Sequence, residues 1–148
     1  MDDIQPYQIV EYANFNNDRK RLLKTHYRRN KKQACVFDCL VESYLDQIKN
    51  APFSNSLLYL NSKASVADEP YPQDALLEGF VFRKVRFIMP GLFKLARYGR
   101  LIYIVYNAQF LIFPICIYTH SEYPKRPPDK ELKRELTLIN SYIEETFK

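Results

Sequence analysis

Three segments with the composition of β-strands follow one another in the second half of this 148-residue chain. All three are rich in β-branched and aromatic residues, and we predict strands at 80–88, 99–106 and 109–119. Short connections with turn signals join them, so consecutive antiparallel pairing is expected. Pro114 falls within the third segment and, because proline cannot donate to the strand ladder, it predicts a bulge at that point.

Helical patterns flank these strands. Apolar residues at 3.6-residue spacing predict a helix over 31–50, and a more polar, cationic helix is expected over 18–29. A first strand is expected at 6–15 and a C-terminal helix at 128–147. The order β-α-α-β-β-β-α predicts an α+β fold: a small antiparallel sheet with the helices packed on one face.

The length is that of one domain, so 1–148 is interpreted as a single unit. The segment 51–78 fits least well, because it mixes polar residues and prolines without a clear period. It is expected to be a long insertion or loop, with either a short strand or a helical turn at 57–60. Such connections are uncommon in compact domains, and the sequence leaves open whether this one has a role or is a mobile insertion.

The distribution of charge is more informative than its sum. The chain has 22 Lys and Arg against 17 Asp and Glu, a net charge of +5. Eight Lys or Arg and a single acid occupy 17–34, whereas 79–121 holds six Lys or Arg and no Asp or Glu. A two-metal nuclease or a glycosidase needs clustered carboxylates, so 79–121 supplies neither kind of site.

Several other classes are disfavoured. Three glycines and no Gly-rich phosphate motif exclude the two common nucleotide-binding loops. Cys35 and Cys39 are more typical of buried free thiols than of metal ligands because no second Cys or His pair complements them, and Cys116 is expected in the core. No metal and no cofactor are therefore expected. The odd, low cysteine count favours a reducing cytoplasm, and the sequence shows neither a signal peptide nor a membrane span.

A candidate site emerges from strand alternation. Lys84 and Arg86 share one face of their strand, Arg100 begins the next strand, and His120 ends the third. Antiparallel pairing brings these four residues to one rim, where no carboxylate is expected nearby. Arginine suits bidentate phosphate contact and lysine supplies a point charge, so the pattern predicts a phosphate-binding concavity. A solvated basic sheet face remains the alternative.

Such a concavity fits one reaction that needs no metal. The ribose 2′-OH of RNA attacks the adjacent phosphate, and cations stabilise the dianionic transition state. Crowded cations disfavour each other's protonation, so a lowered pKa of one lysine would let that lysine act as a base. His120 is a second candidate for proton transfer, because histidine side chains ordinarily titrate near neutral pH.

The sequences at 82–87, 98–103 and 115–120 resemble the C-terminal half of the RelE/ParE toxin superfamily. In that family a strand with lysine or arginine, any residue, then arginine precedes a glycine-x-arginine strand, a hydrophobic strand and a helix. The first strand and helical pair, 6–52, are similar only in topology. The resemblance implies a small cytoplasmic toxin of a type II toxin–antitoxin pair. RelE-like members cleave mRNA in the ribosomal A site without metal.

The resemblance also implies roles for residues. Lys84, Arg86, Arg100 and His120 would be catalytic. Further RNA contacts are expected from Arg83, Lys94, Arg97, Tyr123, Lys125 and Arg126. Ribosome docking is expected from Arg21, Lys24 and Arg28 of the cationic helix. The partners would be a cognate antitoxin, the ribosome and mRNA, with no membrane.

For two of these segments, an interpretation without any binding role stays open. The cationic helix is equally a solvated face, and 123–128 is equally a rigid lead into the last helix. At the level of the whole protein, the alternatives are a ParE-like or degenerate binding module without catalysis, and a basic nucleic-acid-binding protein.

Overall fold

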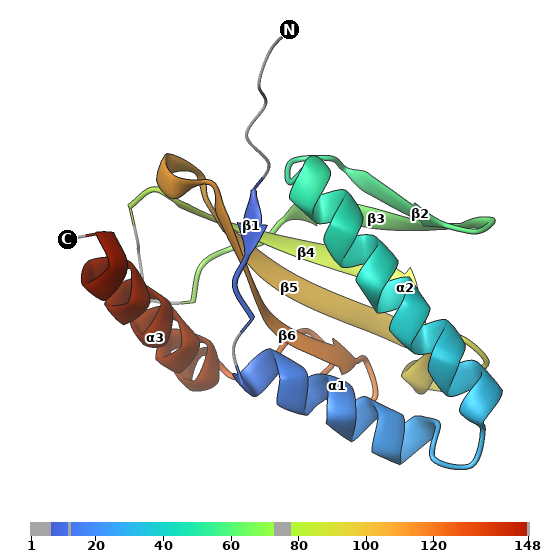
Figure 1. Cartoon of the computed structure of the whole chain (residues 1–148). Coiled ribbons are helices and arrows are strands. Elements are labelled where there is room, and N and C mark those ends of the chain that lie inside the picture. The colour runs from blue at the N-terminus through green and yellow to red at the C-terminus, as the bar shows by residue number, and fades with distance from the viewer. Residues whose placement is uncertain (1–6, 12, 73–77, 148) are drawn as a thin grey trace, which may run out of the picture.

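The computed structural model of the chain describes residues 7–11, 13–72 and 78–147, and Figure 1 shows the arrangement of its elements. In chain order the elements are β1 (Gln8–Ile9), α1 (Ala13–His26), α2 (Lys31–Asn50), β2 (Ser56–Tyr59), β3 (Ser62–Asp68), β4 (Phe80–Ile88), the 3-10 turn η1 (Lys94–Arg97), β5 (Tyr98–Tyr106), the 3-10 turn η2 (Asn107–Gln109), β6 (Leu111–Thr119) and α3 (Asp129–Phe147). The expected α+β class is confirmed.

The strands form one curled sheet in the order β1-β6-β5-β4-β3-β2. β1 runs parallel to β6, whereas every other neighbouring pair is antiparallel. The expectation of a purely antiparallel sheet is therefore wrong. The two parallel strands are far apart in sequence, so no short hairpin fixes their relative direction.

The segment 51–78 contributes to the sheet. It contains the β2–β3 hairpin, which extends the sheet beyond β4, while residues 73–77 lie outside the described part. Within the hairpin only alternate apolar residues are buried: Leu57, Ala64 and Val66. Three small apolar anchors among Ser, Asn and Lys give a weak hydrophobic period, which explains why the sequence predicted a loop.

The two N-terminal helices differ in how well the sequence predicted them. α2 has the expected bounds, and the Asn30 side chain caps it by accepting a hydrogen bond from the Gln33 backbone nitrogen at 3.1 Å. α1 begins at Ala13 instead of residue 18. Asp18, expected at the helix start, lies inside the helix and accepts a hydrogen bond from the Ile117 backbone nitrogen of β6 at 3.1 Å.

Helices cover both faces of the sheet. α1 and α2 pack on one face against a core that includes Val85, Leu101 and Ile117. α3 packs on the opposite face, with its buried stripe against β4, β5 and β6 (Figure 1). The expectation that all helices lie on one face is therefore wrong. Amphipathic spacing shows that a helix buries one side, but not which face of a sheet receives it.

The bulge predicted at Pro114 is confirmed. Tyr103 pairs with Pro114 while Ile102 pairs with Cys116, so Ile115 is the extra residue in β6. Its carbonyl oxygen accepts a hydrogen bond from Asn14 Nδ2 of α1 at 2.6 Å. The extra residue also shifts the alternation of β6, so that the side chains of 116 and 118 join 111 and 113 on the α3 face. Without the bulge, residues 117 and 119 would face α3 in place of 116 and 118.

None of the helices in the described part of the chain combines the length and apolar character that a membrane span requires.

Candidate functional site

A cleft of about 480 Å³ lies on the α3 face of the sheet, at the end that α3 leaves uncovered. The side chains expected to meet there do so, because Lys84, Arg86, Arg100 and His120 all line it. Arg86 is the direct cross-strand partner of Arg100, which pairs in turn with Tyr118 of β6. Strand register therefore places the two guanidinium groups on the same face as neighbours.

The change from apolar to cationic residues along β4 explains why the cleft is open. Phe80 and Phe82 pack beneath α3 in the apolar cluster of that face. Lys84 and Arg86 continue the same alternating side of the strand towards the opposite end. α3 buries only the apolar end, and the cationic end forms the floor of the cleft.

A carboxylate also lines this cleft, which no pattern in the sequence indicated. Glu69 follows β3 directly, and its Oε2 lies 3.6 Å from Lys84 Nζ and 3.2 Å from Arg126 Nη1. The expected absence of a nearby acid is therefore wrong. The acid-free stretch begins at residue 79, just before β4, whereas Glu69 lies earlier in the chain, directly after β3.

Two of the cations remain without an acidic partner. Among the described residues, neither Arg86 nor Arg100 forms an ion pair with a carboxylate. Arg100 Nη1 donates to the Gly99 carbonyl oxygen at 2.8 Å, and burial together with Arg86 lowers the pKa of Arg100. Adjacent like charges without a counter-charge favour an anionic ligand.

Lys84 sits deepest in the cleft. Burial lowers its pKa, the nearby Glu69 carboxylate opposes that effect, and Arg86 and Arg100 lower it further. The expected direction is confirmed, but burial is the largest cause and crowding of cations comes after it. Lys84 Nζ also donates to the Lys125 carbonyl oxygen at 2.8 Å, so its ammonium group is held in one position.

The segment after β6 forms the second wall. The Lys125 carbonyl oxygen accepts a hydrogen bond from Tyr118 Oη at 2.5 Å in addition to that from Lys84. Arg126 bonds Glu69 and Asp129, and both Lys125 and Arg126 line the cleft. This wall is therefore anchored to the sheet, and its two basic residues, from which RNA contacts were expected, line the cleft.

His120 lies at the rim. Its backbone nitrogen donates to the Tyr98 carbonyl oxygen at 2.9 Å, and its ring meets the Tyr98 ring edge-on with centroids 6.2 Å apart. The bulge at Ile115 sets the alternation that directs residue 120 to this face. His120 is thus positioned by β5 and β6 together.

Arg83, expected to contact RNA, lies on the opposite face. Its side chain is only 4% exposed and donates to the carbonyl oxygens of Phe53 and Ser54 and to Asn55 Oδ1. These contacts attach the start of the β2–β3 segment to the sheet. Strand alternation explains the difference from Lys84, and the expected RNA contact is wrong for this residue.

The remaining expected RNA contacts lie outside the cleft. Tyr123 packs edge-on against Tyr118, with centroids 5.7 Å apart, and lines a separate cavity beside α3. Lys94 and Arg97 are exposed on η1, where the Arg97 guanidinium lies 4.7 Å from the centroid of the Tyr98 ring. The structure does not bring these three residues to the four-residue site.

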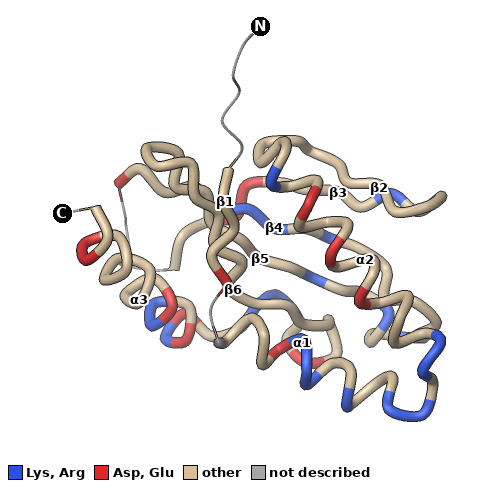
Figure 2. The backbone as a smooth tube through the Cα atoms, in the orientation of Figure 1, with Lys and Arg blue, Asp and Glu red and all other residues tan. Residues whose placement is uncertain are grey.

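Some basic residues of the cationic helix form ion pairs, and others are exposed to solvent. Arg21 bonds Glu122 at 2.7 Å and also Asp18; burial lowers its pKa, but these hydrogen bonds outweigh burial and raise the pKa above its usual value. Arg21 therefore attaches α1 to the end of β6 and does not fit the expected docking role. Lys24 and Arg28 are exposed, and Figure 2 shows Lys and Arg gathered along α1 and the turn to α2.

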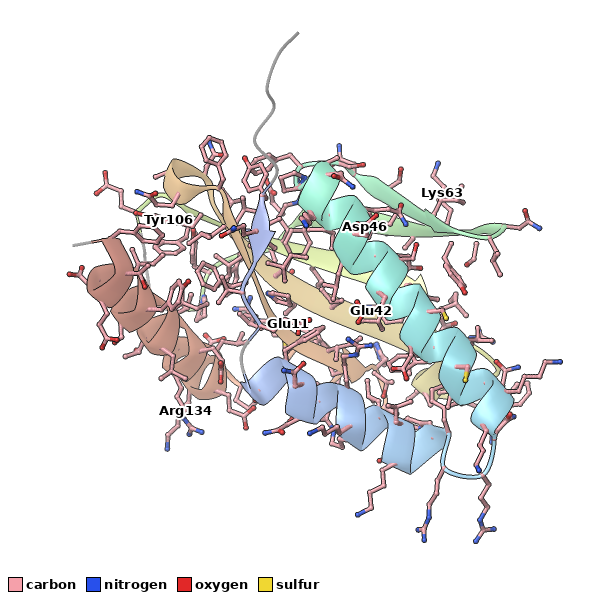
Figure 3. The ribbon with its side chains drawn as sticks, viewed as in Figure 1. Glu11, Glu42, Asp46, Lys63, Tyr106 and Arg134 are labelled. Atoms are coloured by element: carbon pink, nitrogen blue, oxygen red, sulfur yellow. The ribbon has the colours of Figure 1, made fainter. Side chains whose placement is uncertain are left out.

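Acidic side chains on α2 and beside β1 reduce the net positive charge of the neighbouring surface. Glu11, Glu42 and Asp46 line a hollow between β1 and α2 (Figure 3). Arg19 of α1 bonds both Asp38 and Glu42 of α2 at 3.2 Å. The charges of the two helices therefore stabilise their contact, and the outer surface of α2 is not uniformly basic.

The cysteines and metal expectations can also be compared with the structure. Cys116 is buried as expected, whereas Cys35 and Cys39 are exposed, so the interpretation of those two as buried thiols is wrong. They lie on the outer side of α2, opposite its buried stripe. No group of three or more His, Cys, Asp or Glu in the described part of the chain could hold a metal ion.

Comparison of the chain with known protein families, with curated proteins and with solved structures finds no match in any of the three. The function of this chain is therefore inferred from the geometry of the cleft and the residues that line it.

Proposed function

We propose that this protein is the cytoplasmic toxin of a type II toxin–antitoxin pair and cleaves mRNA on the ribosome without a metal ion. The observation that carries this proposal is the meeting of Lys84, Arg86, Arg100 and His120 in one cleft, with two arginines that have no acidic partner among the described residues. A phosphodiester matches that charge and the fork geometry of arginine. The resemblance of three sequence segments to RelE-like toxins points to the same ligand.

The reaction is an internal transfer at phosphorus. The ribose 2′-oxygen forms a bond to the phosphorus, the bond to the 5′-oxygen breaks, and the products are a 2′,3′-cyclic phosphate and a 5′-hydroxyl. One proton leaves the 2′-OH and one reaches the departing 5′-oxygen. Arg86, Arg100 and Lys84 stabilise the charge that grows on the phosphoryl oxygens. His120 accepts the proton of the 2′-OH, and a water molecule from solvent supplies the proton that reaches the departing 5′-oxygen.

Glu69 refines the role of Lys84. A carboxylate at 3.6 Å favours the charged ammonium form and opposes the lowering of the Lys84 pKa by burial. Lys84 therefore acts as a held positive charge, and proton transfer falls to His120 in this proposal. Lys125 and Arg126 would contact neighbouring phosphates from the second wall.

A cognate antitoxin would cover the same cleft. An acidic segment laid against Arg86 and Arg100 would compete with RNA for the cations and block the reaction. Lys24 and Arg28, which are exposed on the basic surface of α1 and its turn, remain the candidates for ribosome docking.

That exposed basic surface supports a second candidate function. A protein that binds nucleic acid through α1 and the turn to α2 would need no cleft. It would show a steep loss of affinity with salt and no cleavage of RNA.

Induced expression tests the proposal. The wild-type protein should arrest growth and translation, and mRNA from the arrested cells should carry new 5′ ends within translated codons. Purified protein should produce the same ends on ribosomes programmed with one mRNA. Arg100→Ala should remove both effects, whereas Lys130→Ala, a charge change on exposed α3, should keep them. Intact mRNA with altered DNA supercoiling would instead favour a ParE-like activity, and growth arrest that survives Arg100→Ala would contradict the site.

A further inference from the structure

A second hollow, of about 640 Å³, adjoins the cationic cleft and shares Arg86 and Arg100 with it. Ala64, Phe87, Ile88 and Tyr98 give this hollow walls that are mainly apolar. The two arginines therefore stand between a polar cleft and an apolar one. A ligand that places an anionic group on them extends into the apolar hollow from the same point.

The hollow results from the way the strands separate. β3 pairs with β4 only from Asp68 opposite Arg83 to Ser65 opposite Arg86. Beyond that point β3 continues with β2 alone, while β4 continues to Ile88 with β5 alone. The gap between the two strand ends exposes the side chains of both. The hollow is thus formed mainly by the sheet, with Asn55 added from the loop before β2.

The chemistry of the walls suits a flat aromatic group with polar edges. Tyr98 offers a ring, and Ile88, half exposed, offers an aliphatic surface. Four polar side chains also line the hollow: Asn55, Ser56, Lys63 and Ser65. Arg83 donates to Asn55 Oδ1 at 2.9 Å, which fixes the amide so that its nitrogen remains a donor.

We propose that this hollow is a nucleobase subsite, which receives one base of the RNA whose phosphate is held by Arg86 and Arg100. This inference rests on the proposed function, since it takes a phosphate on the two arginines as its starting point. A nucleotide joins the two chemistries found side by side here: an anionic group, then a sugar, then an aromatic ring. The Asn55 and Ser65 side chains would read the edge of the base.

Two small probes separate the base from the phosphate. Adenosine 5′-monophosphate and ribose 5-phosphate carry the same anionic group, and only the first carries a base. Titrated into the purified full-length chain and followed by calorimetry or NMR, the nucleotide should bind about tenfold more tightly, since stacking of one base contributes roughly 1–3 kcal/mol.

A variant that fills the hollow tests whether the higher affinity for the nucleotide comes from this site. Ser65→Trp places an indole in the hollow and leaves both arginines in place, so the affinity for the nucleotide should fall to that for ribose 5-phosphate, which should not change. Asn61→Trp adds the same ring at the exposed turn between β2 and β3, outside the hollow, and should keep the tenfold difference. Ser56→Trp fills the hollow from β2 and serves as the second variant if Ser65→Trp lowers the melting temperature.

The outcomes distinguish the two proposals. Equal binding of the two probes to the wild-type protein, or a base-dependent gain that survives both filling variants, would overturn the base subsite and leave the phosphate site standing. Failure of both probes to bind would overturn the base subsite and also contradict the phosphate site on which the proposed function depends.

Discussion

Arg83 and Arg86 lie three residues apart on β4, yet the two faces of the sheet use them in opposite ways. Arg83 lies on the α1–α2 face, where it is buried, both of its terminal nitrogens donate to the chain itself, and Asp68 supplies a counter-charge at 3.7 Å, while Nε has no partner among the described residues. Arg86 lies on the α3 face, exposed and without an ion pair in the described part of the chain. The difference shows that a basic side chain by itself does not indicate a binding residue. A basic side chain without a counter-charge does.

The same contrast extends to the whole of each face. On the α1–α2 face, apolar and polar contacts continue along the sheet, and Tyr103 Oη, for example, donates to the Pro52 carbonyl oxygen at 2.8 Å. On the α3 face, a single helix covers one end, and the cationic end faces solvent. We therefore expect substitutions on the first face to change stability and those in the cleft to change activity.

The largest effect is expected on the covered face. Arg83→Met removes three hydrogen bonds of a buried guanidinium and leaves their partly buried acceptors without this donor, so it should lower the free energy of unfolding by on the order of 3 kcal/mol. Chemical denaturation measures this. Arg86→Met, the same change on the other face, should alter stability by less than about 0.5 kcal/mol. Equal losses for the two variants would remove the distinction between the faces.

Activity should show the reverse order. Arg86→Met or Arg100→Ala removes a cation that stabilises the transition state, so cleavage of ribosome-bound mRNA should slow by on the order of 10²-fold. Single-turnover cleavage rates measure this, with thermal unfolding as the check that the fold is intact. A rate within about threefold of wild type would mean that the cleft is not the reaction site.

A smaller effect is expected from the acid of the cleft. Glu69→Gln removes a carboxylate that competes with ligand phosphate for Lys84 and Arg126, so the affinity for ribose 5-phosphate should rise about threefold to tenfold. Asp68→Asn is the matched control, because the neighbouring Asp68 lies beside Arg83 on the other face. Weaker binding by Glu69→Gln would show that Glu69 positions the cations instead of competing for them.

The smallest effect depends on pH. Glu135 of α3 is buried, its Oε2 has no hydrogen-bond partner among the residues that the structure describes, and burial raises its pKa from the ordinary 4.5. The folded state therefore holds the proton more tightly than the unfolded state, and stability falls as pH rises through the raised pKa. Glu135→Gln should raise the melting temperature at pH 8 by a few degrees and have no effect at pH 4. A lower melting temperature at pH 8 would mean that the carboxylate makes a stabilising contact.

The sequence predicted the elements better than their arrangement. The apolar period of α2 and the strand composition of β4 to β6 determined their bounds to within about two residues, because these segments carry strong local signals. The partner of α3 could not be predicted, since its apolar stripe fits either face of a sheet. β3 was missed, and 57–60 was left open between a short strand and a helical turn where β2 forms, because the three buried apolar anchors of this hairpin are separated by polar residues.

The candidate site was also predicted only as far as local sequence patterns reach. Alternation placed Lys84 and Arg86 on one face, and three strands with short connections brought Arg100 and His120 to them. Glu69 was missed because it depends on pairing between β3 and β4, which no local pattern indicated. Arg83 was expected to contact RNA. Strand alternation predicts which face of the sheet its side chain occupies, but it does not predict the carbonyl oxygens of Phe53 and Ser54 that bind the guanidinium there.

Side-chain NMR tests most directly whether the cleft binds RNA. We expect a short RNA with a 2′-O-methyl group at the cleavage position, and so unable to react, to shift the guanidinium resonances of Arg86 and Arg100 and the ring resonances of His120. The signals of Arg83 should stay in place. Shifts confined to α1 and its turn, with the cleft resonances unchanged, would contradict the cleft as the RNA site and identify the exposed basic surface in its place.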